Sequence, residues 1–282
     1  MRFGHLLAGL FLICASGAVR TQHYSWWSDD PRPYLQAIRS TGSGNPLNLA
    51  SGEAIRAGIV THHFLASALM VRFFATLRAH SSPKTIILIG PNHHHHGSAN
   101  ISVSSLPWKT PFGLLPTDLR IVQQIAAATD LPEDPQAFSG EHSVGVLVPF
   151  VKYYFPHSDV VPILLDINAR EEPLRKLRVW LSNLLRNPQI LVVLSMDFSH
   201  NSTAAVAATR DEQSRQVISA LDSACVRGLN VDCPKGLWLL LASLQNQGSV
   251  KVQIGEHTNS ARLTANPSQP DVTSYFTVYF LK

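Results

Sequence analysis

Short runs of apolar residues recur along the chain and predict a set of buried strands. The runs at 54–60, 84–90 and 189–197 are dominated by apolar residues, which is typical of strands covered on both faces of a sheet. Polar residues follow each of these runs at once, so the end of each strand is visible in the sequence. Further strands are predicted at 100–105, 159–167, 250–256 and 273–281.

Segments with helical periodicity separate these runs. Leu65, Leu69, Phe73 and Leu77 repeat every four residues, which places them on one face of an amphipathic helix. Further helices are predicted at 117–128, 143–155, 174–184, 206–225 and 235–247.

The alternation of strands and helices predicts the fold class. It favours an α/β protein with a largely parallel or mixed central sheet flanked by helices. The 282 residues are enough for one large domain, and the sequence shows no linker that would separate two. We therefore expect a single domain over residues 22–282.

The first residues differ from the rest of the chain. In "MRFGHLLAGLFLICASGAVR" an early Arg2 precedes the apolar stretch 6–15, and small residues follow it. This layout is typical of a secretory signal peptide, here residues 1–18, and it is too short to span a bilayer comfortably. The sequence thus predicts an exported or periplasmic protein with no stable membrane span after signal removal. If the segment is instead a frayed or membrane-lying helix, the protein is cytoplasmic.

Charge excludes one class of partner. The formal net charge is only +4, and the basic residues form no run and do not alternate with aromatic residues. A nucleic-acid-binding surface is therefore not expected. The sequence leaves the partner as an unknown small-molecule substrate or protein.

Polar side chains follow three of the predicted strands. His62 and His63 follow the run at 54–60, the block His93–His96 follows the run at 84–90, and Asp197 and His200 follow the run at 189–197. The carboxyl ends of parallel strands meet at one edge of a sheet, where ligand sites form. Each residue alone is better explained as structural, but together they predict a site at this edge.

The residue types at this edge favour a metal. Imidazole nitrogens with one thiolate suit Zn, Fe(II) or Cu, and the absence of an acidic cluster argues against Mg or Ca. Successive side chains of an extended segment point in opposite directions, so at most one or two histidines of the block His93–His96 face the site. A histidine that is not a ligand can move a proton there.

Two further motifs admit structural explanations. Glu141, His142 and Ser143 precede the helix at 143–155, and Ser143 is expected to cap it. Cys225 and Cys233 are eight residues apart, so in an oxidising compartment they can form a disulfide instead of leaving Cys233 as a ligand.

Ordered motifs show a family resemblance. The segments "GIVTHHFLASALM", "IILIGPNHHHHG", "EHSVGVLVPF", "VVLSMDFSHN" and "TSYFTVYF" occur in the order typical of the Memo family, whose prokaryotic members are called AmmeMemoRadiSam system protein B. The resemblance covers nearly the whole chain after the N-terminal segment. It implies a fold similar to the LigB-type non-haem iron extradiol dioxygenases and a pocket for Fe(II) or Cu.

The resemblance also implies roles for particular residues. His62, His93 and Cys233 are the implied metal ligands, and Asp197 and His200 line the same pocket. In an enzyme, His200 acts as the acid or base and Asp197 orients it or a bound water. Glu141, His142 and His94 are expected around the ligands.

Two functional hypotheses follow from this resemblance. The first is a metal-dependent redox enzyme that resembles a dioxygenase. The second is a non-catalytic metal-binding or protein-interaction protein on the same scaffold, because a fold does not fix a function.

Overall fold

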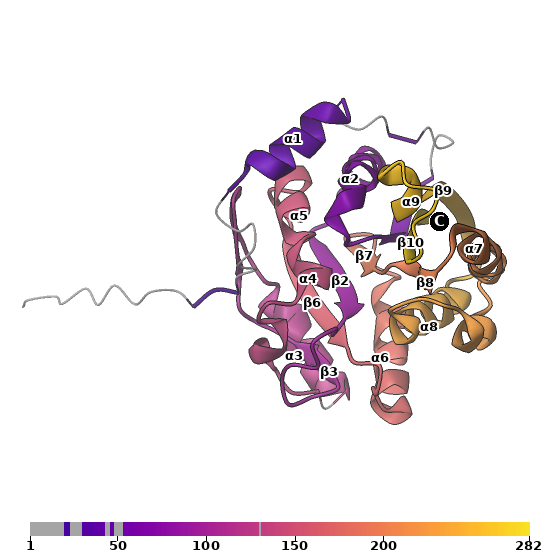
Figure 1. The fold of residues 1–282 in the computed structure, drawn as a ribbon. Coiled ribbons are helices and arrows are strands. Elements are labelled where there is room, and N and C mark those ends of the chain that lie inside the picture. Colours follow the sequence, from indigo (N-terminus) through magenta and orange to yellow (C-terminus); the bar gives the residue numbers. More distant parts are fainter. Residues whose placement is uncertain (1–19, 23–29, 43–45, 48–52, 130) are drawn as a thin grey trace, which may run out of the picture.

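A mixed sheet forms the centre of the protein (Figure 1). The structure is a computed structural model that describes residues 20–22, 30–42, 46–47, 53–129 and 131–282. The sheet has eight strands in the order β3-β6-β2-β7-β1-β10-β8, and β9 pairs with β10 beside this path. The strands are β1 (Ile55–Val60), β2 (Thr85–Pro91), β3 (Ile101–Val103), β6 (Asp159–Leu165), β7 (Ile190–Ser195), β8 (Phe198–Ser202), β9 (Lys251–Asn259) and β10 (Val272–Leu281).

The parallel part of the sheet lies in its middle. Strands β6, β2, β7 and β1 run parallel to one another. The flanking strands β3 and β10 pair antiparallel with β6 and β1, and β10 pairs antiparallel with β8 and β9. The predicted single-domain α/β fold with a mixed sheet is confirmed.

Helices cover both faces of the sheet because the central strands are apolar on both sides. Along β2, Ile87 and Ile89 belong to one core cluster, and Ile86 and Leu88 belong to the other. The first cluster includes side chains of α3 (Leu119–Thr129), α6 (Glu171–Leu184), α7 (Ala204–Ser219) and α8 (Pro234–Leu244). The second includes side chains of α1 (Arg32–Ser40), α2 (Ser67–His80) and α5 (Val148–Tyr154).

The predicted helix at 143–155 is wrong in two respects. The segment forms two helices, α4 (His142–Gly145) and α5, and α5 has Pro149 in its first turn, where the missing N–H costs no hydrogen bond. The cap of α4 is Glu141, whose side chain accepts a hydrogen bond from the backbone N–H of Ser143, so Ser143 is not the cap. This places the Glu141 carboxylate inside the protein instead of on its surface.

Several other elements differ from the sequence prediction. The helix predicted at 206–225 ends at Ser219, and the 3-10 helix η3 (Ser223–Gly228) follows it after Leu221, which has a positive φ of 53°. Helix α1, strand β8 and the hairpin of β4 (Trp108–Thr110) and β5 (Gly113–Leu115) were not predicted. The short helix α9 (Ser260–Leu263) joins β9 to β10.

The N-terminal and membrane predictions have different outcomes. Residues 1–18 lie outside the described part of the chain, so the signal peptide and export stay predictions. Among the described residues, every helix is too short or too polar to cross a bilayer.

One close approach inside the sheet gives a stability test. A Cβ at Gly58 of β1 would lie 2.6 Å from Cζ of Phe73 and 3.0 Å from the carbonyl oxygen of Val278. We expect Gly58→Ala to lower the free energy of unfolding by roughly 1–3 kcal/mol, measured by urea denaturation, because the core is already filled. Gly228→Ala is the control, since nothing lies within 4 Å of a Cβ there. Equal urea midpoints for Gly58→Ala and Gly228→Ala would contradict the close packing around Gly58.

Candidate metal centre

Three neighbouring strands deliver the site. In the sheet β7 lies between β2 and β1. His62 follows the end of β1, His93 follows the end of β2, and Asp197 follows the end of β7. The rings of His62 and His93, far apart in the sequence, have centroids 5.0 Å apart. The parallel topology therefore brings together the polar residues that follow these strands.

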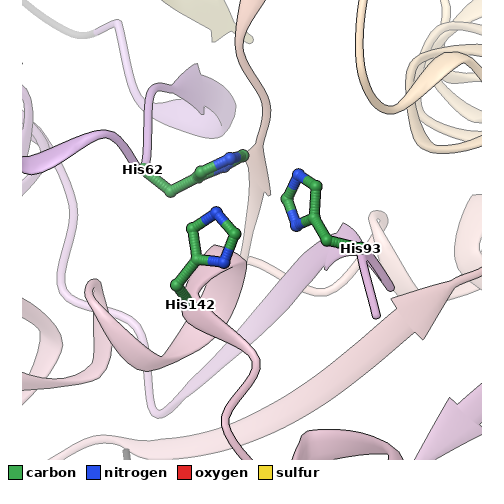
Figure 2. A group of neighbouring side chains, drawn as sticks. All are labelled: His62, His93 and His142. Carbon is green, nitrogen blue, oxygen red and sulfur yellow. The ribbon is translucent and has the colours of Figure 1, made fainter. Parts of the chain in front are cut away.

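A third histidine joins these two (Figure 2). The ring of His142, at the start of α4, stacks on His93 with centroids 4.3 Å apart and lies edge-on to His62 at 5.2 Å. One nitrogen from each of the three rings lies within 4.8 Å of the other two. The three rings face one another, as ligands around one ion do.

The ring of His62 is fixed by a chain of hydrogen bonds. Its Nδ1 lies 3.0 Å from Oγ of Ser195, and that hydroxyl donates its own proton to the carbonyl oxygen of Ser143. Because the hydroxyl has only one proton, Nδ1 of His62 must be the donor. In the neutral ring, Nε2 of His62 then carries a lone pair.

The ring of His93 is fixed in the same sense by Glu141. Nδ1 of His93 donates to Oε1 of Glu141 at 2.9 Å, and the backbone N–H of His93 donates to Oε2 at 2.7 Å. A carboxylate oxygen only accepts, so Nε2 of neutral His93 also carries a lone pair. A histidine that gives its second N–H to a carboxylate is the usual partner arrangement of a metal ligand.

Both Nε2 atoms face Asp232, which was not among the site residues predicted from the sequence. Oδ2 of Asp232 lies 3.2 Å from Nε2 of His62 and 3.6 Å from Nε2 of His93. This oxygen is buried and makes no hydrogen bond of acceptable geometry. Both ring nitrogens thus lie within 3.6 Å of one buried carboxylate oxygen, which can accept a proton from a ring or share a metal ion with the two nitrogens.

The loop before α8 holds Asp232 in place. Its Oδ1 accepts from the backbone N–H of Asp197 at 3.0 Å, and its own N–H donates to the carbonyl oxygen of Asp197 at 3.2 Å. This reciprocal pair ties the loop to the end of β7. The only signal in the sequence was an acidic residue directly before Cys233.

The pKa shifts show that the site demands positive charge. Burial lowers the pKa of His93, but contacts with Asp232 and Glu141 outweigh it and raise the pKa to about 10. Burial alone would raise the pKa of Glu141, yet His93 lowers it to about 2. Asp232 behaves likewise, because His62, His93 and His200 outweigh its burial and hold its pKa below the usual range. A cation satisfies the same demand.

The pKa values of two of the three histidines are shifted in opposite directions. His62 has a raised pKa because Asp197 and Asp232 outweigh the cost of burial. His142 has a pKa lowered to about 4 by burial and by the charges of His62 and His93. The raised pKa of His62 and the lowered pKa of His142 together indicate that positive charge is favourable beside Asp232 and unfavourable on His142.

A family comparison identifies the chain. A sequence model described as Memo-like protein matches residues 23–279. The chain belongs to the Memo family. The family resemblance predicted from the sequence is confirmed, and the metal and the reaction stay predictions.

Sequence relatives agree with this assignment, and one solved structure shares the fold. A MEMO1 family protein of Caldivirga maquilingensis is 39% identical over 132 residues, 46% of this chain and 46% of that protein. A MEMO1 family protein of Pyrobaculum aerophilum is 27% identical over 221 residues, 74% of this chain and 78% of that protein. The crystal structure of uncharacterized protein JW3007 from Escherichia coli K12 has a TM-score of 0.54 at 14% identity, covering 80% of this chain and 99% of that one. This last likeness shows the fold alone.

Asp197 and His200 of the Memo family motif lie beside the three donors. Oδ1 of Asp197 accepts from the hydroxyl of Thr61 and, at 3.3 Å, from the backbone N–H of His62. Its Oδ2 lies 3.9 Å from Nε2 of His62. His200 lies on β8, where its N–H donates to Oδ1 of Asn230 at 2.6 Å, and its ring is partly exposed.

The block His93–His96 of this Memo family protein divides between several partners. His93 belongs to the central group, and His94 is exposed beside His142 and Glu141. His95 lies against Asp166, with 2.5 Å between Nδ1 and Oδ2. His96 donates from Nδ1 to the carbonyl oxygen of Ser139 at 3.1 Å.

Cys233 lies outside all three groups of metal-capable side chains among the described residues. It directly precedes α8 without a side-chain capping hydrogen bond and belongs to the apolar core, and a Cβ at Gly236 would lie 2.6 Å from its Sγ. Burial raises the pKa of its thiol well above the usual range, and Asp232 adds to the shift. Cys225 is exposed, and neither cysteine forms a disulfide. The structure brings together His62, His93, Asp197 and His142, but not Cys233.

Glu141 gives the test of this arrangement. Glu141→Ala leaves three donors without their acceptor, the two N–H groups of His93 and the backbone N–H of Ser143. We expect the free energy of unfolding to fall by about 3 kcal/mol, measured by urea denaturation. Glu141→Gln keeps one acceptor oxygen and should lose clearly less. Indistinguishable midpoints for the two variants would show that the carboxylate does not hold the loop.

Proposed function

We propose that this Memo family protein is a metal-dependent oxidoreductase that binds one Fe(II) or Cu ion at His62, His93 and Asp232. The observation that carries the proposal is the convergence of Oδ2 of Asp232 with the two Nε2 atoms. Each histidine gives its Nδ1–H to a protein acceptor, which leaves Nε2 for the ion. A bound metal ion accounts for this buried carboxylate oxygen, which has no fixed hydrogen-bond donor.

The spacing between Oδ2 of Asp232 and each of the two ring nitrogens suits a shared ion. Ligands about 2.0–2.2 Å from a metal lie about 3 Å from one another in tetrahedral or octahedral sites. Oδ2 of Asp232 is 3.2 Å from Nε2 of His62 and 3.6 Å from Nε2 of His93.

The donor set supports redox chemistry more strongly than the sequence did. Two histidines and one carboxylate, with open positions, are typical of non-haem Fe(II) oxygenases. From the sequence, Cys233 was expected in the third position, and Asp232, the residue before it, supplies a carboxylate there. His142 lies within reach as a fourth ligand, which would also suit Cu.

The neighbouring residues have roles that their contacts support. When bound, the metal supplies electron transfer and a Lewis acid at this point. Asp197 holds the backbone of His62 and is held by Thr61, so it orients the first ligand. His200 is partly exposed and lies close enough to influence the charge of Asp232. It is therefore the residue we propose to accept or donate a proton at the substrate.

Metal content tests the ligand set. We expect His62→Ala, His93→Ala and Asp232→Ala to lower bound Fe or Cu well below one ion per chain, because each removes a donor from the point of convergence. The measurement is metal analysis of the full-length protein purified without oxygen, with folding followed by circular dichroism.

Two variants serve as controls for this test. His95→Ala removes a histidine of the same block that lies against Asp166, and Cys233→Ala removes the thiol that lies in the core. Both should keep the ion. Full occupancy in Asp232→Ala with loss in Cys233→Ala would reverse the assignment and restore the ligand expected from the sequence.

Turnover separates the two functional hypotheses. We expect oxygen uptake with a member of a panel of catechols, and its loss in His200→Ala with the metal retained, because His200 handles protons and does not hold the ion. Stoichiometric metal without turnover on any catechol would favour the non-catalytic metal-binding protein. Loss of metal in His200→Ala would place His200 among the ligands.

A further inference from the structure

The loop that contains the four histidines is held in one shape. Asn92 bridges it, since its Nδ2 donates to the carbonyl oxygen of His96 at 2.8 Å and its Oδ1 accepts from the N–H of His96 at 3.2 Å. His95 has a positive φ of 52°, which turns the chain inside this bridge. The backbone of the loop therefore determines where each histidine side chain begins.

This shape separates His95 from its neighbours. His95 lies against Asp166. His94 and His96 remain together, with ring centroids 5.4 Å apart, and both are exposed. The carbonyl oxygen of Ser139 accepts from Nδ1 of His96, so Nε2 of the neutral ring has a free lone pair.

A third ring connects this pair to the inner site. The centroid of His142 is 6.0 Å from that of His94. One atom each from His94, Glu141 and His142 lies within 4.8 Å of the other two. Glu141 already accepts three hydrogen bonds, and its Oε1 lies 3.4 Å from Nδ1 of His142. The Glu141 carboxylate thus places negative charge beside the ring of His142 while it keeps its hydrogen bonds with His93.

We propose that His94 and His142, with the Glu141 carboxylate beside them and His96 next to His94, form a second, outer site that takes a divalent ion of the imidazole-binding class from solvent and passes it to the inner centre. Imidazole ligands suit Zn²⁺, Co²⁺ and Cu²⁺. This inference rests on the proposed function of the inner centre. His142 belongs to the outer group and also to the group of His62 and His93, so an ion can change ligands one at a time.

Burial of the inner centre is the physical reason for such a route. His62 is only 3% exposed and the side chain of Asp232 only 10%, although the side chain of His93 is 27% exposed. An ion that enters must lose its water, and ligands met on the way replace that water in steps. The exposed rings of His94 and His96 offer the first of these ligands.

The test counts Co²⁺ ions on the metal-free full-length protein by equilibrium dialysis without oxygen. We expect the wild-type protein to bind two equivalents, one tightly and one more weakly. The double variant His94→Ala/His96→Ala should lose the weaker equivalent and load the tight one more slowly in stopped-flow absorbance. His95→Ala is the matched control, because it removes an exposed histidine of the same loop that faces Asp166.

The outcomes separate the two proposals. Retention of the weaker equivalent in the double variant overturns the outer site, as does an equal loss in His95→Ala, which would mean that the histidine-rich loop binds ions without this geometry. His62→Ala should remove the tight equivalent and leave the weaker one. Loss of the weaker equivalent in the double variant, with His62→Ala binding both, would support the outer site and contradict the inner centre.

Discussion

Oδ2 of Asp232 lies inside the protein, 3.2 Å from Nε2 of His62 and 3.6 Å from Nε2 of His93, without a hydrogen bond. A buried carboxylate that lacks a donor or a counter-ion costs several kcal/mol. The positive charge that it requires can come from protons on the two rings or from a metal ion. The raised pKa values of His62 and His93 and the lowered pKa of Asp232 are three expressions of this one requirement.

The fold aims both rings at this carboxylate. Ser195 at the end of β7 accepts a hydrogen bond from Nδ1 of His62, and Glu141, directly before α4, accepts one from Nδ1 of His93. The carbonyl oxygen of Ser143, in the same helix α4, accepts from Ser195 and so links the two arrangements. One short helix therefore fixes the orientation of both rings, and the loop with Asp232 is tied to the end of β7 through Asp197.

The sequence was informative about the strands and about the polar residues at their carboxyl ends. Apolar runs with polar ends predicted β1, β2 and β7, and parallel topology then placed His62, His93 and Asp197 at one edge. Asp232 was missed because it lies in a loop after the 3-10 helix η3. No periodic pattern in such a loop predicts where a side chain points. Because 143–155 was predicted as one helix, the burial of the Glu141 carboxylate at the start of a separate helix was not predicted. The contacts of His142 depend on the position of that carboxylate. Cys233 was favoured by family register, but side-chain packing beside Gly236 places it in the core.

The central claim is that Asp232 completes a two-histidine, one-carboxylate centre. The most direct measurement is a crystal structure of the full-length protein loaded with Fe(II) without oxygen, with anomalous scattering at the iron edge. The account predicts one main iron peak about 2.0–2.2 Å from Nε2 of His62, Nε2 of His93 and Oδ2 of Asp232. An iron bound through Sγ of Cys233, or through the Nδ1 atoms with Asp232 left outside, would contradict it.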